Sequence, residues 1–465
     1  MEKNYTFIQM VKKYVSSSVL LVLATIAALV IANLPSTKEW YQSIWQEEVS
    51  LSIGSFHLFS HHGQDMNLLQ FINDFLMAIF FLSVGLELKR EIFCGGELSS
   101  VKKAMLPVIG ACGGMLMPIV IFFIALHLTV SDPDMLGVMS RGLPIPMATD
   151  IAFSLGVLSM FSKRVPLGLK VFLAALAVAD DLGGIIVIAV KYTDHISIPH
   201  LLGAFACAGL CLLTSFFWKS ATKMAYFTIG LAMWWFMLNS GIHATIAGVL
   251  LAFCVPARLN NGTRFYIERI RKHIDKFPHI KVTARDRKTP NMLSEDNIQD
   301  LRAIEAASDH LISTLQDMED ILRNPINFFI IPLFAFANAG VCFDGMSLAN
   351  LFQGVGLGVF TGLLIGKFTG VFTASWISIK LNIVQMPENT TWGAMAGVAA
   401  LCGIGFTVSM FMSALSYPPT LPGHDAETML TLLNDAKLGI LSGTIASALA
   451  GSLILNHTLP KAKTE

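Results

Sequence analysis

Long apolar runs dominate the chain and are separated by short polar segments. They lie, for example, near Val19 to Ala32, Leu68 to Leu86, Ala104 to Leu128 and Leu438 to Leu455. A helix needs roughly 18 to 25 apolar residues to cross the hydrocarbon core of a bilayer. About twelve runs of this kind can be counted, some of them broken. The pattern predicts an all-α polytopic membrane protein with about twelve transmembrane helices.

A short segment between the first two runs has a different period. From Val49 to Ser60 apolar and polar side chains alternate on both sides of Gly54 and Ser55. Alternation around such a pair predicts a small β-hairpin, placed outside the membrane by its position in the chain. A disordered loop is the alternative, and the pattern does not decide between the two.

The most charged part of the chain is Arg258 to Arg323, which we interpret as a cytoplasmic insert. Ser294 can cap an amphipathic helix near residues 294–322. The predicted division of the chain is therefore a first membrane part at 1–257 with about eight spans, the insert at 258–323, about four last spans at 324–457 and a tail at 458–465.

The distribution of lysine and arginine predicts the orientation of the spans, because these residues mark cytoplasmic loops. They precede the first run at Lys12 and Lys13 and follow the second at Lys89 and Arg90, whereas none lies between Ser413 and Asp435. Both termini are therefore expected in the cytoplasm. A cleaved signal peptide is the alternative for the first run, but the polytopic chain that follows favours an uncleaved helix.

Composition agrees with a membrane protein and excludes one class of partner. Hydrophobic residues make up 54% of the 465 residues and charged residues only 14%, against about 25% charged residues in soluble domains. The formal net charge is zero, and no basic run is interleaved with aromatic residues, so nothing indicates nucleic-acid binding. The lipid bilayer is the predicted partner, and neither a soluble partner nor a cofactor is indicated.

Four ionisable residues lie inside apolar runs, near the middle of the membrane by counting from the ends of each run: Asp150, Asp180, Asp181 and Lys367. A charge at the bilayer centre costs about 2.5 to 3.5 kcal/mol on insertion scales. A purely structural aspartate–lysine pair is one explanation. One lysine cannot neutralise three carboxylates, however, so protons, a cation or a water-filled cavity must compensate for the excess negative charge.

The adjacency of Asp180 and Asp181 has a geometric consequence. Neighbouring side chains on a helix point about 100° apart, so one carboxylate can face a cavity while the other reaches a second helix. A hard cation such as Na⁺ binds carboxylate, hydroxyl and carbonyl oxygens, and Thr149 beside Asp150 supplies a hydroxyl. Protons and the cation would compete for these oxygens.

Free backbone carbonyls require broken helices, and two runs contain residues that break helices. Pro144 and Pro146 precede Asp150, and Gly403 and Gly405 lie near the middle of a late run. Interrupted segments in the two halves of a transporter mark its binding site. Glycines used only for close helix packing are the alternative.

Seven motifs in order resemble the NhaA-type sodium/proton antiporters of bacterial inner membranes, over nearly all of the chain except Arg258 to about Asp317. They are NDFLMAIFFLSVGLELKRE (Asn73 to Glu91), ATDIAFSLGVL (Ala148 to Leu158), DDLGG (Asp180 to Gly184), SGIHATIAGV (Ser240 to Val249), PLFAFANAGV (Pro332 to Val341), LLIGK (Leu363 to Lys367) and CGIGFT (Cys402 to Thr407).

The resemblance implies a twelve-helix inverted-repeat fold with two discontinuous crossing helices, and electrogenic, pH-regulated exchange of sodium for a larger number of protons. By motif position Asp180 and Asp181 are the proton- and cation-binding pair, and Lys367 is the partner of Asp180, released when sodium binds. Asp150 would offset the dipoles of the broken helix ends, and Thr149 would offer an oxygen to Na⁺. Li⁺ stays open as a second cation.

The resemblance also implies a pH response and a dimer. Glu87, Arg90 and Glu91 resemble the family's pH-sensing entrance, and His243 matches a histidine linked to the same response. The family's glutamate near PLFAFANAGV is matched loosely by Glu319, since Asp320 and Arg323 stand where histidines are expected. In the family, a hairpin like that at 49–60 joins two protomers into a homodimer.

Buried aspartates also occur in proteins with two other functions. An intramembrane aspartyl protease would use two of them as an acid–base pair, but such enzymes share a Gly-Xaa-Gly-Asp element and no Gly-Asp dipeptide occurs here. A passive cation channel could be lined by acids, but broken helices and Lys367 suit a site that closes around its ion. The sequence therefore favours a transporter over an enzyme.

Overall fold

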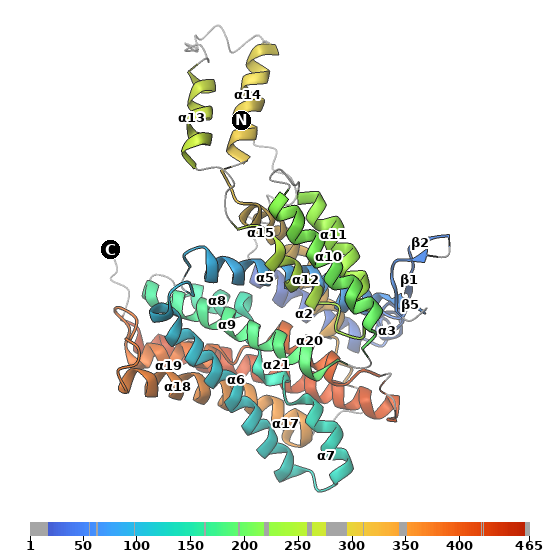
Figure 1. Cartoon of the computed structure of the whole chain (residues 1–465). Helices are drawn as coiled ribbons and strands as arrows, with labels where there is room; N and C mark the ends of the chain where they lie inside the picture. The colour runs from blue at the N-terminus through green and yellow to red at the C-terminus, as the bar shows by residue number, and fades with distance from the viewer. Residues whose placement is uncertain are drawn as a thin grey trace.

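Helices make up most of the molecule, as the computed structural model in Figure 1 shows. The structure describes residues 17–54, 56–61, 64–96, 98–161, 164–193, 196–217, 223–257, 263–275, 295–309, 311–343, 351–419, 421 and 423–460. The predicted cytoplasmic lysines before the first run, the predicted helix cap at Ser294 and most of the C-terminal tail lie outside these residues.

Seven helical stretches of the described part are long and apolar enough to cross a membrane. They are Leu68–Phe93 (α4, η1 and α5), Val101–Thr129 (α6), Leu167–Lys191 (α9), Ile198–Phe217 (α10), Thr314–Asn338 (α15, η4 and α16), Gly354–Lys380 (α17, η6 and α18) and Ala426–Thr458 (α21).

Three further helix pairs bend sharply at a short break. They are Ser17–Asn33 (α2) with Lys38–Ile44 (α3) at 116°, Pro133–Met147 (α7, η2 and η3) with Ile151–Ser159 (α8) at 43°, and Trp392–Leu401 (α19) with Phe406–Ser416 (α20) at 42°. Counting each pair as one span gives up to 10. Lys223–Leu238 (α11) and Ile246–Cys254 (α12) have only 16 and 9 residues, so the total of twelve stays a prediction.

The predicted interruptions at Pro144 and Pro146 and at Gly403 and Gly405 are confirmed by two of these bends. After η3 (Ile145–Met147) the chain is extended at Ala148, and α8 begins again only after Asp150. In the late run α19 ends at Leu401 and α20 begins at Phe406. Each break leaves backbone groups without helical partners, which must be satisfied elsewhere.

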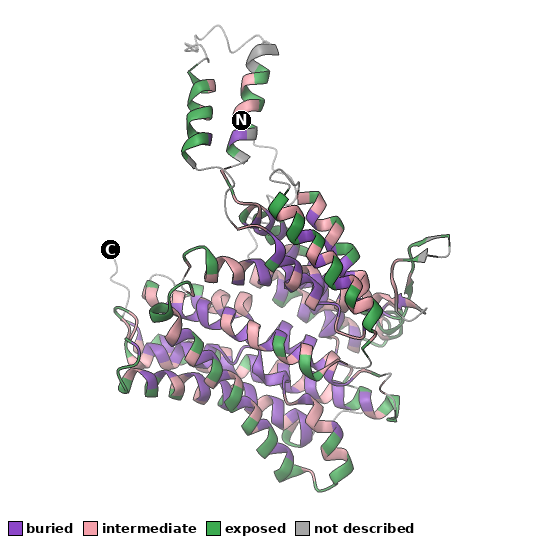
Figure 2. Ribbon diagram, viewed as in Figure 1, coloured by how far each residue is buried: buried purple, intermediate pink, exposed green. Residues whose placement is uncertain are grey.

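Close packing between helices relies on small residues. An added Cβ at Gly113 of α6 would clash with the backbone oxygen of Gly370 in α18 (Phe368–Lys380), and one at Gly370 would clash with Gly113. Apolar lipid tails offer no hydrophobic drive for helix association, so such close approach of backbones supplies much of the contact. Figure 2 shows that buried residues follow the inner faces of these helices.

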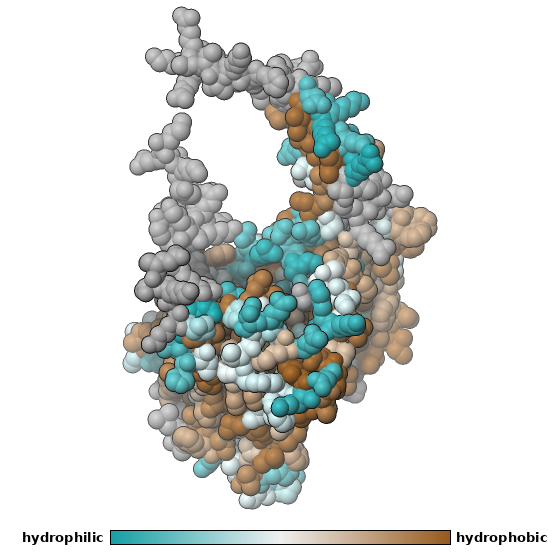
Figure 3. All heavy atoms as spheres, turned by 90° about the vertical axis from the view of Figure 1, so that its left-hand side faces the viewer, coloured by the Kyte–Doolittle hydropathy of each residue, from teal (hydrophilic) through white to brown (hydrophobic). Residues whose placement is uncertain are grey.

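The outer faces are apolar, as expected for surfaces that lipid covers. On α6, for example, Leu116 is 65% exposed and Leu128 80% exposed. Figure 3 looks onto the side where α18 and α19 lie in Figure 1, and on it hydrophilic side chains gather toward the middle while hydrophobic ones lie along the lower and right-hand edges. A polar middle bordered below and on the right by apolar side chains suits a bundle that crosses a bilayer.

Short antiparallel strands occupy the connection between α3 and α4. Strands β1 (Glu48–Val49), β5 (Gln64–Asn67) and β4 (Ser60–His61) form a sheet in that order. Strands β2 (Ser52–Ile53) and β3 (Phe56–His57) pair around Gly54, whose φ of 63° suits glycine. Alternating residues in the sequence thus lie in paired strands, and β2 projects beyond the helices in Figure 1.

The charged insert contains helices that differ from the single one predicted near 294–322. The described part has α13 (Thr263–Ile274) and α14 (Glu295–Asp309), joined by a hydrogen bond of 2.7 Å between His273 Nδ1 and Asp300. A new helix, α15 (Thr314–Pro325), starts at Ser313, whose hydroxyl accepts from the backbone of Gln316. The apolar side chains at helical spacing in this region therefore belong to two helices, Leu301 and Ile304 to α14 and Leu315 and Met318 to α15, because this cap separates them.

In the part of the chain that the structure describes, three spans contain a π-helical stretch. These are η1 (Phe71–Leu76), η4 (Ile326–Ile330) and η6 (Gly362–Lys367). Such stretches are rare and are frequently found at functional sites. Here they carry Asp74, Asn327 and Lys367.

Candidate ion-binding site

The two broken spans meet at Asp150, whose carboxylate caps two helices. One oxygen accepts from the backbone N–H of Phe153 in α8 at 3.0 Å. The other accepts from the backbone N–H of Thr407 in α20 at 3.1 Å and from its hydroxyl at 2.6 Å. Helix N-termini carry partial positive charge, so one negative group stabilises both of them. Asp150 is buried, with 2% exposure.

Hydroxyl groups satisfy the carbonyl ends of the same breaks. Thr149 Oγ1 lies 2.9 Å from the Cys402 oxygen, and Ser154 Oγ lies 3.2 Å from that of Leu401. From the second break to the first, Ser409 Oγ donates to the Ile145 backbone oxygen at 2.8 Å. A backbone hydrogen bond of 2.7 Å also joins Asp150 N to Ile404 O. These hydrogen bonds therefore connect the two breaks to each other.

Asp180 and Lys367 form a buried ion pair. Lys367 Nζ donates to Asp180 Oδ2, and both side chains are 0% exposed. The same oxygen lies 2.8 Å from Thr149 Oγ1. Oδ1 of Asp180 has no hydrogen-bond partner within the described structure. Thr149 thus has one proton and two acceptors within reach, Asp180 and the Cys402 oxygen.

Asp181 points elsewhere, into a cavity of about 280 Å³. The predicted divergence of the two aspartates is therefore present, since Asp180 does not line this cavity. Thr149, Asp150 and Asp181 share its walls. The other lining residues are Ser17, Phe80, Ser83, Val84, Glu87, Arg90, Ile151, Ala152, Glu319, Arg323, Ile326, Asn327, Ile331, Thr407 and Val408.

Five charged residues form a group, the entrance cluster: Glu87, Arg90, Glu319 and Arg323 line the mouth of the cavity, and Glu91 contacts Arg90. Arg90 donates to Glu319, lies 3.3 Å from Glu91 and 3.9 Å from Glu87, and Arg323 lies 3.3 Å from Glu319. Three carboxylates and two guanidinium groups leave one negative charge in excess. Such a cluster attracts cations toward the cavity.

Exposure falls from the mouth of the cavity to its inner end. The side chains of Glu87 and Arg323 are 39% and 56% exposed, whereas Asp181 is 6% exposed. The cavity therefore connects the surface near the end of α5 (Met77–Phe93) with a carboxylate in the middle of α9.

His243 lies apart from the entrance cluster. Its Nε2 lies 3.6 Å from Asp74 Oδ1, its Nδ1 2.9 Å from Thr245 Oγ1, and its ring packs edge-on against Phe411. The predicted pH-response residues therefore lie at two separate positions, the entrance cluster and the surroundings of His243. Asp74 was not singled out from the sequence, although a carboxylate within an apolar span is the kind of signal that identified the other aspartates.

A group of hydrogen bonds, called the outer seal below, links the ends of α9 and α20 that lie farthest from the cavity to residues 139–141. Tyr192 OH lies 2.7 Å from Ser416 Oγ and 3.2 Å from the oxygen of Arg141, and Arg141 Nε donates to the Ser416 oxygen at 3.2 Å. Tyr417 OH donates to Met139 O at 2.7 Å. Tyr192 follows Asp181 by about 16 Å along the helix, so this outer seal is well separated from the cavity.

The hydroxyls of the outer seal stay protonated near neutral pH. Burial raises the pKa of Tyr192 and the pKa of Tyr417 above the ordinary tyrosine value. Both phenols can therefore donate hydrogen bonds throughout the physiological range. None of these seal residues was predicted from the sequence, because tyrosine and serine near a helix end give no distinctive pattern.

The geometry argues against an acid–base pair of the protease type that includes Asp150. Both of its oxygens accept backbone hydrogen bonds from helix N-termini. A carboxylate held in this way is a cap rather than a general base with a free lone pair. The remaining pair, Asp180 and Asp181, lies next to a lysine, a threonine and a cavity that leads to the surface, an arrangement suited to a small cation and protons.

Comparison with known proteins agrees with this chemistry. The profile of the family described as Na+/H+ antiporter 1 matches residues 8–455. A protein named Na(+)/H(+) antiporter NhaA from Bacteroides thetaiotaomicron is 46% identical over 451 residues, which cover 97% of this chain and 96% of that protein. Proteins of the same name from Porphyromonas gingivalis W83 and Psychrobacter cryohalolentis are 41% and 39% identical, over 99% and 96% of this chain and 98% and 93% of their own. The several apolar helices fit a multi-pass bacterial membrane protein, and the chain belongs to the Na+/H+ antiporter 1 family, a family of transporters.

Proposed function

We propose that this protein is an electrogenic antiporter that exchanges intracellular Na⁺ for external protons by alternating access, in sodium and pH homeostasis. One observation carries the proposal: Asp181 is buried at the inner end of a cavity that reaches the surface on one side, while a hydrogen-bonded seal closes the other. We place the protein in the bacterial inner membrane with both termini and the entrance cluster in the cytoplasm.

In the proposed cycle a sodium ion enters past the entrance cluster and binds oxygens of Asp181 and Thr149. Asp180 then turns from Lys367 to the ion, since its Oδ1 has no other partner in the described structure. Two carboxylates binding one monovalent cation must release protons held there or on Lys367. More protons than sodium ions move in each cycle, so the exchange carries net charge.

Alternating access requires the cavity to close and the outer seal to open. In the proposal, α8 and α20 move together, because Asp150 caps both and hydroxyl groups brace the breaks. The hydrogen bonds of Tyr192 and Tyr417 would then break in the outward-facing state. Inverted repeats that place one broken span in each half would relate the two states by a pseudo-two-fold rotation about an axis in the membrane plane.

The first test is sodium-induced dissipation of a preset pH gradient in proteoliposomes, measured over a pH series. Protons compete with Na⁺ for the same oxygens, so the half-saturating Na⁺ concentration is expected to rise as pH falls, up to about tenfold per pH unit for each competing proton. Clamping the membrane potential should change the rate. A half-saturating concentration independent of pH, or a rate insensitive to the clamp, would contradict competition or electrogenic exchange respectively.

We further propose that the entrance cluster tunes the pH response. Glu319, 5% exposed, accepts from both Arg90 and Arg323, and Asp320 lies 3.6 Å from Arg323. Glu319→Gln removes the central charge of this network, so the pH at which exchange is half-maximal is expected to shift by about one unit. The control is Glu268→Gln on the exposed helix α13. An unchanged pH profile in Glu319→Gln would show that another group regulates exchange. His243 and Asp74 would then be the next candidates.

The homodimer is proposed from the hairpin β2–β3. Its two strands are only two residues each and pair with each other, which leaves free edges that a second copy can extend. Replacing residues 51–58 by a Gly-Ser linker of the same length should convert the detergent-solubilised dimer into a monomer, measured by light scattering. A variant that stays dimeric would place the interface elsewhere.

A further inference from the structure

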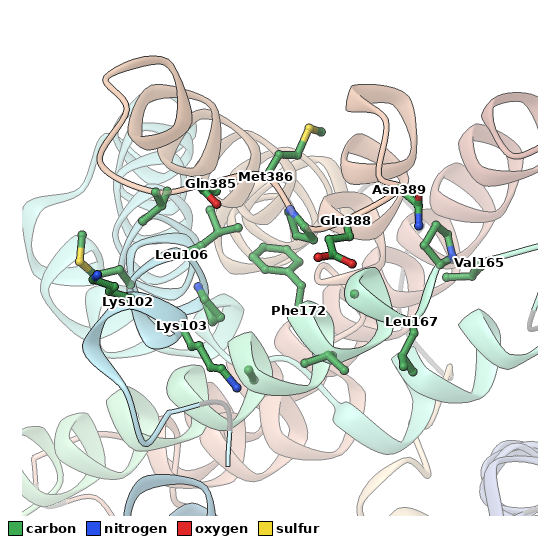
Figure 4. Close-up of a pocket in the computed structure, with 18 of the residues that line it drawn as sticks. Lys102, Lys103, Leu106, Val165, Leu167, Phe172, Gln385, Met386, Glu388 and Asn389 are labelled. Atoms are coloured by element: carbon green, nitrogen blue, oxygen red, sulfur yellow. The ribbon is translucent and has the colours of Figure 1, made fainter. Parts of the chain in front are cut away.

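A second and larger groove lies apart from the ion site. It has a volume of about 1210 Å³ and is bordered by the start of α6, the start of α9 and the loop that joins α18 to α19. None of the residues proposed for ion binding or pH response lines it. Figure 4 shows Phe172 and Glu388 toward the middle of the groove, with Lys102 and Lys103 beside each other at its α6 side.

The groove has an apolar interior and a polar rim. Leu106, Phe172 and Val384 in its wall are 5%, 3% and 8% exposed and belong to one hydrophobic cluster of the protein. Lys102, Lys103 and Glu388 line the same groove and are exposed. A ligand that fills this space must therefore be amphipathic, with a polar group at the rim.

The rim carries an excess of positive charge. Lys102, Lys103 and Arg164 face a single acid among the described lining residues, Glu388. Among the described residues, the guanidinium group of Arg164 donates hydrogen bonds to uncharged oxygens, those of Asn456, Leu459 and Pro460. The charge complement of this rim is an anionic headgroup.

The N-terminus of α6 adds to the positive potential. Its N-cap residue Ser100 makes no side-chain cap, and its first turn contains the two lysines and no acid. Acidic residues are the usual and favourable choice in the first turn, because the helix end is itself partly positive. Lysines there are unfavourable for the isolated helix and become favourable when an anion binds between them.

The groove lies at the ends of two helices long and apolar enough to cross a membrane, so we expect it at the depth of lipid headgroups. Both α6 and α9 are membrane spans, and their first turns form its border. Next to the rim, Val101 is 77% exposed and Leu167 is 76% exposed, as expected for side chains in contact with acyl chains. A lipid of the adjacent leaflet can therefore enter the groove without leaving the bilayer.

We propose that this groove binds an anionic phospholipid. The phosphate lies at Lys102 and Lys103, and an acyl chain packs on Leu106, Phe172 and Val384. The bound lipid joins α9, which carries both transport aspartates, to the loop between α18 and α19. It thereby stabilises the helices that hold Lys367 and the late break.

The test measures binding of phosphatidylglycerol and phosphatidylcholine to the full-length protein in detergent by native mass spectrometry. The variant is Lys102→Gln with Lys103→Gln, and the matched control is Arg269→Gln with Lys272→Gln on the exposed helix α13. Phosphatidylglycerol is expected to bind the wild type and the control equally and the lysine variant roughly thirtyfold more weakly. Phosphatidylcholine should bind weakly to all three proteins.

A second variant separates charge from folding. Lys102→Arg with Lys103→Arg keeps both charges and is expected to retain phosphatidylglycerol binding. If the double glutamine variant does not fold, Lys102→Gln alone is compared with Lys272→Gln and should bind about fivefold more weakly. The proposal is overturned if removing the lysines leaves binding unchanged, if the α13 control loses as much, or if phosphatidylcholine binds as tightly as phosphatidylglycerol.

Discussion

Asp181→Asn is expected to reduce sodium-driven proton movement in proteoliposomes to the level of empty vesicles, while the protein still inserts and purifies normally. Asparagine has nearly the same shape and keeps one oxygen, so the packing of α9 should change little. The asparagine side chain cannot carry a charge or release a proton in the physiological pH range. The site would lose both the carboxylate that binds Na⁺ and an exchangeable proton.

The position of Asp181 makes this the most sensitive single change. It lines the cavity together with Thr149 and Asp150, whereas Asp180 is already paired with Lys367. Since Asp150 is occupied as a helix cap, Asp181 is the carboxylate that binds an ion once it has passed the entrance cluster. Removing its charge leaves the cation with dipoles and with the single carboxylate of Asp180, whose charge Lys367 balances, and these do not offset the cost of dehydration.

A matched control for this variant is Asp134→Asn, an exposed aspartate in the first turn of α7. It should exchange at the wild-type rate, because it lies outside the cavity. Asp181→Asn protein that still moves protons when sodium is added would contradict the assignment of this residue. Binding of ²²Na⁺ measured on the same preparations distinguishes loss of the ion site from loss of the conformational cycle.

The second large effect is expected from Lys367→Met. This change leaves the carboxylate of Asp180 fully buried without its cation, and breaking a buried pair in this way costs about 3 to 5 kcal/mol. The melting temperature in detergent should fall clearly. Asp180→Asn combined with Lys367→Met removes both charges, so the double variant should recover most of the lost stability while exchange stays abolished.

Comparing the two single variants with the double variant shows whether Asp180 and Lys367 stabilise the protein as a pair or as independent charges. Lys380→Met, at the exposed end of the same helical span, is the control for losing a lysine and should change the melting temperature little. If the destabilisations of the two single variants simply add in the double variant, the pair does not couple. Recovery of stability without recovery of exchange would support a role for the pair in the transport cycle.

Several features follow from the sequence because they depend on local pattern. Apolar runs of membrane length predict the spans, since any such run in a bilayer must satisfy its backbone within a helix. Pro144 and Pro146 and Gly403 and Gly405 predict the two breaks, because proline removes a helical hydrogen bond and glycine weakens the helix. The alternation around Gly54 likewise coincides with the paired strands β2 and β3.

Other features depend on contacts between residues far apart in the chain. Nothing local joins Asp150 to Thr407, yet the carboxylate caps the helix that follows the second break. The same holds for Glu319, a loose motif match that the fold brings to Arg90. The sequence also does not show that Asp74 lies beside His243 or that the tyrosines of the outer seal are hydrogen-bonded. These contacts are known only from the tertiary structure.

The sequence by itself determined that this chain is a membrane protein, that its charges within the spans are few, and that adjacent aspartates must diverge, because hydropathy and helix period act locally. The tertiary structure decided which aspartate pairs with Lys367 and which faces the cavity. It also decided that both breaks share one cap and that a basic groove forms at the starts of α6 and α9. These outcomes depend on contacts between side chains of different helices. Hydrophobic periodicity within one helix does not determine such contacts.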